Sequence, residues 1–128
     1  MNDETSINYS TNEIIQSLWI GGDFSTMEQL SAKSFLLQGH EYHLYTYGDV
    51  GNVPPGVVLK DANEILDKSE VFTYRNGSYS AFSNLFRFTL LEKRGGYWAD
   101  TDLVCVQNMK AFENEDIVIV TEPSERYT

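Results

Sequence analysis

Basic residues are scarce in this sequence. The 128 residues include only nine lysines and arginines against nineteen aspartates and glutamates, which gives a formal net charge of −10. A surface this acidic repels nucleic acid and anionic lipid, so neither is expected as a bulk partner. An anionic substrate would therefore depend on a local basic group or on a bound metal ion.

Cysteines, leader-like segments and membrane-spanning segments are lacking as well. The single cysteine, Cys105, cannot close an intrachain disulfide, and its valine neighbours predict a small buried residue in a strand. Residues 1–12 are polar, lack the basic and apolar regions of a signal peptide, and predict a flexible lead-in. No apolar run approaches the length of a membrane span. We therefore expect a cytoplasmic protein without a transmembrane segment, either free or peripheral at the inner face of the membrane.

The chain does contain enough apolar material for one domain, with 41% hydrophobic and 13% aromatic residues. Its strand and helix signals alternate, which predicts an α/β fold with a largely parallel sheet. The expected elements are, in order, a buried strand at 13–20, a helix from the capping box at Ser25 and Glu28 to about Gly39, a strand at 42–47, a loop at 48–56, a short strand at 57–59, a short helix at 62–66, a helix from Ser78 or Ser80 to about Arg94, extended segments at 97–102 and 103–106, and a strand at 116–121.

Residues 13–128 are predicted to form a single domain, because no internal repeat or low-complexity segment divides them. The residues after the last predicted strand contain no evident closing element. We therefore expect the chain to be the N-terminal portion of a longer protein, truncated at its C-terminus.

The predicted helix before Gly95 is apolar on most of its surface, so we expect it to be largely buried. Its remaining stripe is polar and contains Ser83, Asn84 and Arg87. A buried arginine requires a partner. Arg87 could form an ion pair with Glu92 or with a nearby aspartate, or its guanidinium could bind the diphosphate of a ligand. Asn84, one turn earlier on the same face, could bond a sugar hydroxyl or cap a backbone group.

The segment after this helix places two carboxylates two residues apart. Asp100 and Asp102 follow the pair Gly95-Gly96, which ends the helix, and two aromatic residues. In an extended segment, residues i and i+2 point to the same side, so both carboxylates can hold Mg²⁺ or Mn²⁺ with the phosphate it carries. Two solvated turn aspartates are the alternative, but the end of a strand in an α/β sheet is where ligands bind.

The end of the first predicted strand offers a second set of candidates. Trp19 is either a core residue or a plate on which a nucleobase stacks. Gly21 and Gly22 follow it and would let the backbone approach a ligand closely. They do not extend to a GxGxxG or P-loop pattern, and His40 and His43 have no metal-ligand or triad partner at a useful spacing.

Two blocks of the chain resemble the glycosyltransferases that contain a DXD motif. The family includes bacterial capsule and lipopolysaccharide transferases, the fungal initiating mannosyltransferases and the clostridial glucosylating toxins. The similarity covers roughly residues 13–110, and the second block is the more specific. The blocks are Leu18-Trp19-Ile20-Gly21-Gly22 and the stretch from Phe82 through Gly95-Gly96-Tyr97-Trp98-Ala99-Asp100-Thr101-Asp102.

The resemblance implies a GT-A fold, a Rossmann-like α/β fold that binds a nucleotide-diphosphate sugar together with Mn²⁺ or Mg²⁺, and it favours a UDP-sugar. It further implies a metal-dependent hexosyltransferase of polysaccharide biosynthesis that retains the anomeric configuration. The acceptor in such a reaction is a glycan, a lipid-linked sugar or a protein.

The family's functional residues map onto named positions of this sequence. By resemblance, Trp19 stacks on the base, Asp102 binds the metal, and Asp100 binds ribose or sugar and contributes to the metal site. Arg87 contacts the donor and joins the two aspartates as a catalytic residue. The other donor-binding positions are Ile20, Gly21, Ser83, Asn84, where relatives carry an aspartate, and Trp98, where some relatives carry a tyrosine.

Two alternative functions fit parts of the sequence. The string from Asp100 to Val104 matches the nucleophile motif of haloacid dehalogenase-like phosphatases, although Gly95 and Gly96 interrupt the apolar strand that this motif requires. The other alternative is a non-catalytic, truncated module that binds a sugar nucleotide without turnover. In either version of the sugar-nucleotide hypothesis, we expect the isolated 128-residue chain to transfer little or no sugar.

Overall fold

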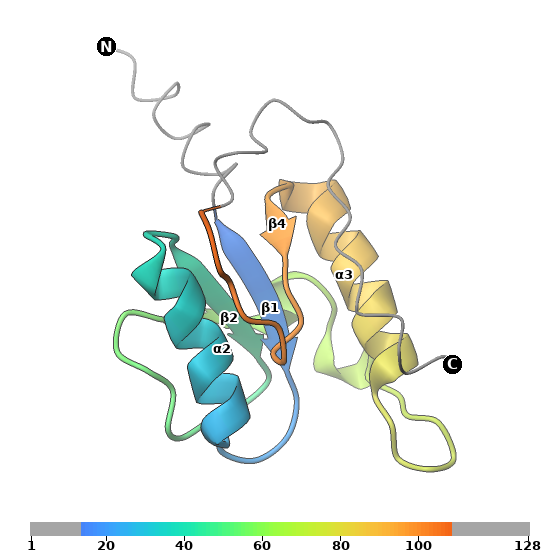
Figure 1. Cartoon of the computed structure of the whole chain (residues 1–128). Coiled ribbons are helices and arrows are strands. Elements are labelled where there is room, and N and C mark those ends of the chain that lie inside the picture. Colours follow the sequence, from blue (N-terminus) through green and yellow to red (C-terminus); the bar gives the residue numbers. More distant parts are fainter. Residues whose placement is uncertain (1–13, 109–128) are drawn as a thin grey trace, which may run out of the picture.

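The computed structural model of the chain describes residues 14–108, which form a four-stranded sheet with a helix packed on each face (Figure 1). None of the helices in this range is long and apolar enough to cross a membrane. The elements are β1 (Ile15–Trp19), α2 (Thr26–Leu37), β2 (Tyr42–Thr46), β3 (Val58–Asp61), the 3₁₀ turns η1 (Ala62–Glu64) and η2 (Lys68–Glu70), α3 (Ser80–Arg94) and β4 (Tyr97–Trp98).

The sheet has the strand order β3-β2-β1-β4, and every neighbouring pair is parallel. The central strand β1 pairs along its whole length with β2, and it pairs with β4 at Ile15↔Tyr97 and Gln16↔Trp98. Parallel strands need a long connection that returns the chain to the same end of the sheet. Helix α2 lies in the connection from β1 to β2 and α3 in the one from β3 to β4, whereas a loop over 47–57 connects β2 to β3. The predicted α/β fold with a largely parallel sheet is confirmed.

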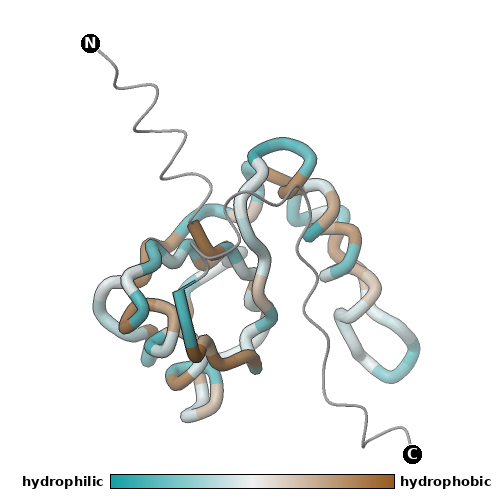
Figure 2. The backbone as a smooth tube through the Cα atoms, turned by 45° about the horizontal axis from the view of Figure 1, so that its top comes forward, coloured by the Kyte–Doolittle hydropathy of each residue, from teal (hydrophilic) through white to brown (hydrophobic). Residues whose placement is uncertain are grey.

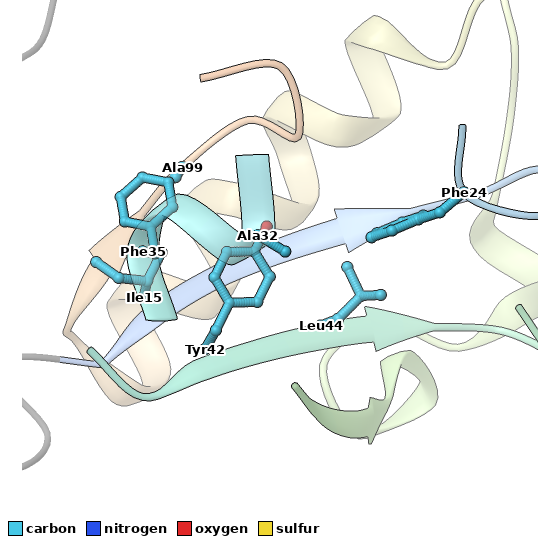
Figure 3. Close-up of a cluster of buried hydrophobic side chains, with 7 residues drawn as sticks. All are labelled: Ile15, Phe24, Ala32, Phe35, Tyr42, Leu44 and Ala99. Atoms are coloured by element: carbon cyan, nitrogen blue, oxygen red, sulfur yellow. The ribbon is translucent and has the colours of Figure 1, made fainter. Parts of the chain in front are cut away.

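Each face of the sheet carries its own hydrophobic cluster. On the α2 face, Phe35 from the helix packs against Tyr42 from β2, and Figure 3 shows both rings among the other buried members of this cluster. On the α3 face, the Phe86 ring contacts Phe82 and Tyr45. Apolar and polar stretches accordingly alternate along the chain trace (Figure 2).

Helix α3 is less buried than its composition predicts. Phe82, Phe86 and Leu90 are 0% exposed, whereas Leu85 is 43% and Phe88 is 66% exposed. The three buried residues recur every four positions, so they form one stripe that meets the sheet. The prediction of a largely buried helix is wrong, because a sheet covers only one face of a helix and apolar residues on its other faces stay at the surface.

Most helix ends follow local sequence signals. The predicted capping box of α2 is present, with the Ser25 backbone N–H donating to Glu28 Oε1 at 2.6 Å. Helix α3 ends at Gly95, where φ is 68°, a left-handed value that favours glycine. The predicted helix at 62–66 is shorter than expected and consists of the single turn η1.

The start of α3 differs from the prediction. Tyr79 occupies the N-cap position and makes no side-chain cap bond, whereas Ser78 or Ser80 was expected there. Ser78 instead precedes the N-cap residue by one position, and its hydroxyl accepts a hydrogen bond from the Ser80 backbone N–H at 3.1 Å. This bond still satisfies one of the free N–H groups at the helix start.

The segment at 103–106 leaves the sheet and follows α2. The Ser31 hydroxyl donates to the Leu103 carbonyl, and the Cys105 N–H donates to Ser34 Oγ at 2.8 Å. Because these side-chain bonds replace a strand ladder, the prediction that Cys105 lies buried in a strand is wrong, and its side chain is half-buried. The predicted lead-in at 1–12 and the predicted strand at 116–121 lie outside the described residues.

Replacing Phe86 tests how far the fold depends on the buried stripe of α3. We expect Phe86→Ala to lower the free energy of unfolding by about 3–5 kcal/mol, because it leaves a cavity between Tyr45, Phe82 and Trp98. Urea unfolding followed by circular dichroism measures the change. Phe88→Ala is the matched control, since this phenylalanine is exposed on the same helix, and it should change the value by only about 0.5 kcal/mol. Equal losses in the two variants would contradict a single buried stripe.

Candidate functional site

A cavity of about 450 Å³ lies at the carboxyl end of β1. Its walls come from the end of β1, the first turn of α2, the first turns of α3 and the residues from Trp98 to Asp102. Its size is within the range of small-molecule sites, and ligands of open α/β sheets bind at this edge. The fold therefore presents a concave site where its strands end.

The pairing of β4 with β1 carries the two aspartates to this cavity. Trp98 pairs with Gln16, and the Ala99 N–H continues the pairing by donating to the Gln16 carbonyl at 3.0 Å. The chain then turns out of the sheet, with the Leu103 N–H donating to the Asp100 carbonyl at 3.2 Å. The prediction of an extended segment through 102 is therefore wrong beyond Trp98, and a turn, not strand alternation, brings Asp100 and Asp102 to the cavity beside the end of β1.

Most of the residues predicted for the site line this cavity, whereas Gly21 and Arg87 do not. The structure gives the positions of these residues, and the binding role assigned to each of them stays a prediction. The predicted residues that line the cavity are Trp19, Ile20, Ser83, Asn84, Trp98, Asp100 and Asp102.

The loop after β1 holds the Trp19 ring in place. The indole N–H donates to the Gly22 carbonyl at 2.7 Å, and the ring meets Phe24 edge to face, with centroids 5.4 Å apart. A Cβ atom on Gly21 would lie 3.7 Å from the indole, so the backbone of this residue rests against the ring. Its φ of 152° is one that residues with side chains rarely adopt. Gly21 thus supports the tryptophan rather than lining the cavity.

Trp98 orients the first aspartate of the pair. Its indole N–H donates to Asp100 Oδ1 at 2.9 Å, and its ring packs on Phe86 of α3 with centroids 6.3 Å apart. A hydrogen bond to an ionised carboxylate is stronger than one between neutral groups. The second oxygen of Asp100 has no hydrogen-bond partner within the described residues, so it is available to a ligand.

The donor set of the cavity fits a metal ion that arrives with a phosphate. Asp100, Asp102 and Glu28 all line the cavity, yet no three acidic, histidine or cysteine side chains in residues 14–108 converge on one point. Mg²⁺ and similar ions are commonly held by one or two carboxylates together with substrate phosphates and water. Two aspartates on one wall of the cavity could supply the protein's part of such a coordination sphere, and they are too few to coordinate a metal ion without other ligands.

Arg87 lies on α3 one turn after Ser83 and has no acidic partner in the described part of the chain. Its guanidinium instead lies over the Phe88 ring, 5.0 Å from the centroid. Of the two alternatives for Arg87, the ion pair with Glu92 or with an aspartate is therefore not formed within the described residues. The charge of Arg87 is not neutralised by a neighbouring carboxylate in this range.

Sequence reasoning missed several cavity residues, among them Ser17, Glu28 and Tyr79. Strand alternation could have identified Ser17, because it lies two residues before Trp19 on the same face of β1. Glu28 was recognised only for its capping role, which the structure confirms. No local pattern pointed to Tyr79, because its position follows from where α3 begins.

Residues 24–121 match a family model described as "Glycosyltransferase sugar-binding region containing DXD motif". The matched range includes both helices and the Asp100–Asp102 segment, and it begins after Trp19. No curated protein and no solved structure matches the chain.

The bond between Trp98 and Asp100 can be observed directly, because the chain contains only two tryptophans. We expect Asp100→Ala to shift the indole N–H signal of Trp98 in a ¹H–¹⁵N correlation spectrum, since the hydrogen-bond acceptor is removed. The Trp19 indole signal serves as the internal control, because its acceptor is the Gly22 carbonyl. Two unchanged indole signals, or equal shifts in both, would contradict the assigned bond.

Proposed function

The chain belongs to the family of glycosyltransferase sugar-binding regions that contain a DXD motif, and on this premise we propose that its cavity binds a nucleotide-diphosphate sugar with a divalent cation. The parallel sheet flanked by helices agrees with the amino-terminal portion of a GT-A fold. The observation that carries the proposal is that Asp100 and Asp102 share one cavity with Trp19 and with polar residues of α3.

Each wall of the cavity offers one part of the donor a suitable partner. Trp19 would present its ring to the base, since an aromatic face stacks on any base. Ser83 and Asn84 would hydrogen-bond the sugar from the first turns of α3. Asp102 and the free oxygen of Asp100 would hold Mn²⁺ or Mg²⁺, with Trp98 fixing the Asp100 carboxylate.

The charge pattern supports an anionic donor. The chain is strongly acidic, yet residues 71–91 contain no aspartate or glutamate, and this stretch supplies the α3 wall of the cavity. Arg87 belongs to the same stretch, and we propose that its guanidinium stabilises the diphosphate or the donor sugar. This wall therefore adds no repulsion of its own toward a nucleotide diphosphate, whereas Glu28, Asp100 and Asp102 on the other walls need a cation to offset theirs.

The proposed reaction is transfer of a hexose from a UDP-sugar, with retention, to a glycan or similar acceptor in polysaccharide synthesis. Breaking the glycosidic bond leaves charge on the departing diphosphate, and a bound divalent ion would supply Lewis-acid stabilisation of that charge. The chain's own contribution would be to hold the ion with the carboxylates of Asp100 and Asp102. Arg87 lies over Phe88 and outside the cavity lining, so it would have to turn toward the donor to add its positive charge. The resemblance to known transferases supports the donor class and the stereochemistry.

The phosphatase alternative receives less support from the same residues. A haloacid dehalogenase-like nucleophile would follow a full apolar strand, whereas β4 contains only Tyr97 and Trp98 and begins directly after two glycines with positive φ. The family assignment also favours sugar transfer. A binding module without turnover stays compatible with the geometry, because donor binding and transfer use different groups of the complete site.

Metal-dependent binding of UDP tests the proposal by calorimetry. We expect the protein to bind UDP only with Mn²⁺ present, and Asp102→Asn to weaken this binding by more than about tenfold, because it removes a charged metal ligand. Asp49→Asn is the matched control, since it changes the net charge equally in an exposed loop and should retain wild-type affinity. The proposed function would be refuted if UDP bound equally well with and without Mn²⁺, or if neither UDP nor any other nucleoside diphosphate bound.

A further inference from the structure

Two loops meet at the carboxyl edge of the sheet, one after β1 and the other after β2. The Gly51 backbone N–H donates to Asp23 Oδ1 at 2.8 Å, and the Phe24 N–H donates to the Gly51 carbonyl at 3.0 Å. Asp23 and Gly51 are 28 residues apart in the chain, so these bonds join the loops across the fold. We call the pair of bonds the Asp23–Gly51 clasp.

The clasp leaves no room for a side chain on Gly51. A Cβ atom at this position would lie 2.7 Å from Asp23 Oδ1 and 2.8 Å from Asp23 Cγ, closer than van der Waals contact allows. The φ of Gly51 is not positive, so the nearby carboxylate, and not a left-handed conformation, is what favours glycine here. Any larger residue would push the Asp23 carboxylate out of the clasp.

The core holds the β2 side of the clasp. Val50 and Val53 lie on either side of Gly51 and pack against the hydrophobic cluster on the α2 face of the sheet. The β1 side is different, because the three residues between Ile20 and Phe24 are exposed and two of them are glycines. Only the third, Asp23, has a side chain, so its bond to Gly51 restrains a segment with much backbone freedom.

This segment supports the ring of Trp19. The Gly22 carbonyl, which directly precedes Asp23, accepts the indole N–H at 2.7 Å. The Phe24 ring, which directly follows Asp23, meets the indole edge to face. Asp23 therefore lies between the two groups that hold Trp19, and the clasp fixes the backbone on which both depend.

We infer that Asp23 is a positioning residue of the proposed donor site, which through Gly51 sets the orientation of Trp19 before the base arrives. The inference rests on the proposed function, in which the Trp19 ring stacks on the base. A ring that is already held in place loses less conformational entropy on binding, so the ligand binds more tightly. Asp23 is not one of the residues that line the cavity, so it acts through Trp19 and not by touching the ligand.

The charge of Asp23 gives the inference a clear sign. A carboxylate beside the cavity repels an anionic ligand, so its removal would tighten the binding of a nucleoside diphosphate if charge alone mattered. Loss of the clasp has the opposite effect. Asp23→Asn distinguishes the two effects, because it removes the charge and keeps an oxygen atom that can accept the Gly51 N–H.

The experiment compares variants of the clasp by nuclear magnetic resonance and by calorimetry with UDP and Mn²⁺. We expect Asp23→Ala to shift the Trp19 indole signal of the free protein, to leave the Trp98 signal unchanged, and to raise the Kd about fivefold. Asp23→Asn should keep the wild-type Trp19 signal, with a Kd no higher than that of the wild type.

Gly51→Ala acts on the same bond from the other loop. It should displace the Asp23 carboxylate and raise the Kd by a similar factor. Combined with Asp23→Ala it should add little, because the bond is already lost. Fully additive effects in the double variant would contradict a shared action through the clasp.

Asp67→Ala is the matched control. The Asp67 carboxylate accepts the Ser69 backbone N–H at 2.9 Å in an exposed turn, and neither residue lines the cavity. The variant loses the same charge and a comparable bond. It should therefore lower the unfolding temperature to a similar degree as Asp23→Ala, and it should keep the wild-type Kd and both indole signals.

The inference would be overturned by an unmoved Trp19 signal in Asp23→Ala, or by a wild-type or lower Kd in that variant. It would equally be overturned if Asp67→Ala raised the Kd as much, since the effect would then reflect a general loss of stability or charge. If the wild-type protein binds neither UDP nor another nucleoside diphosphate, the proposed function fails. The Trp19 signal alone then decides whether Asp23 positions the ring.

Discussion

The pairing of the short strand β4 with β1 is the interaction on which the cavity depends. It consists of two residue pairs, Ile15↔Tyr97 and Gln16↔Trp98. Two backbone bonds flank these pairs, from the Tyr97 N–H to the Ile14 carbonyl and from the Ala99 N–H to the Gln16 carbonyl. Side chains reinforce it, because the buried amide of Gln16 donates to the Gly95 carbonyl at 2.7 Å just before β4 begins. This junction fixes the chain just before the aspartates, and the bonds of Leu103 and Cys105 to α2 fix it just after them.

The same junction connects the core to the chemistry of the cavity. Phe86 is fully buried on α3, Trp98 packs on its ring, and the Trp98 indole binds Asp100. A buried helix stripe thus positions a carboxylate at the surface through one aromatic intermediate. This arrangement leaves Asp102 exposed and free of protein partners in the described residues, as suits a group proposed to bind a metal with its phosphate.

Local signals predicted the elements of the fold well. The capping box of Ser25 and Glu28 and the positive φ at Gly95 follow from side-chain chemistry within a few residues, so the sequence was sufficient to locate these helix ends. The burial of α3 was overestimated because composition does not reveal how many of its faces are covered, and Leu85 and Phe88 prove to be exposed. Predictions of this kind fail where contacts distant in sequence decide the outcome.

The sequence by itself determined the alternation of strands and helices, the glycine stop before β4 and the presence of two carboxylates two residues apart just after it. It also carried the resemblance to DXD-containing transferases, to whose family the chain belongs. Only the tertiary structure decided that Asp100, Trp19 and Asn84 line one cavity and that Arg87 has no acidic partner in the described range. The physical reason is that periodicity and capping act over a few residues, whereas these relations depend on strand order and register, which join residues far apart in the chain.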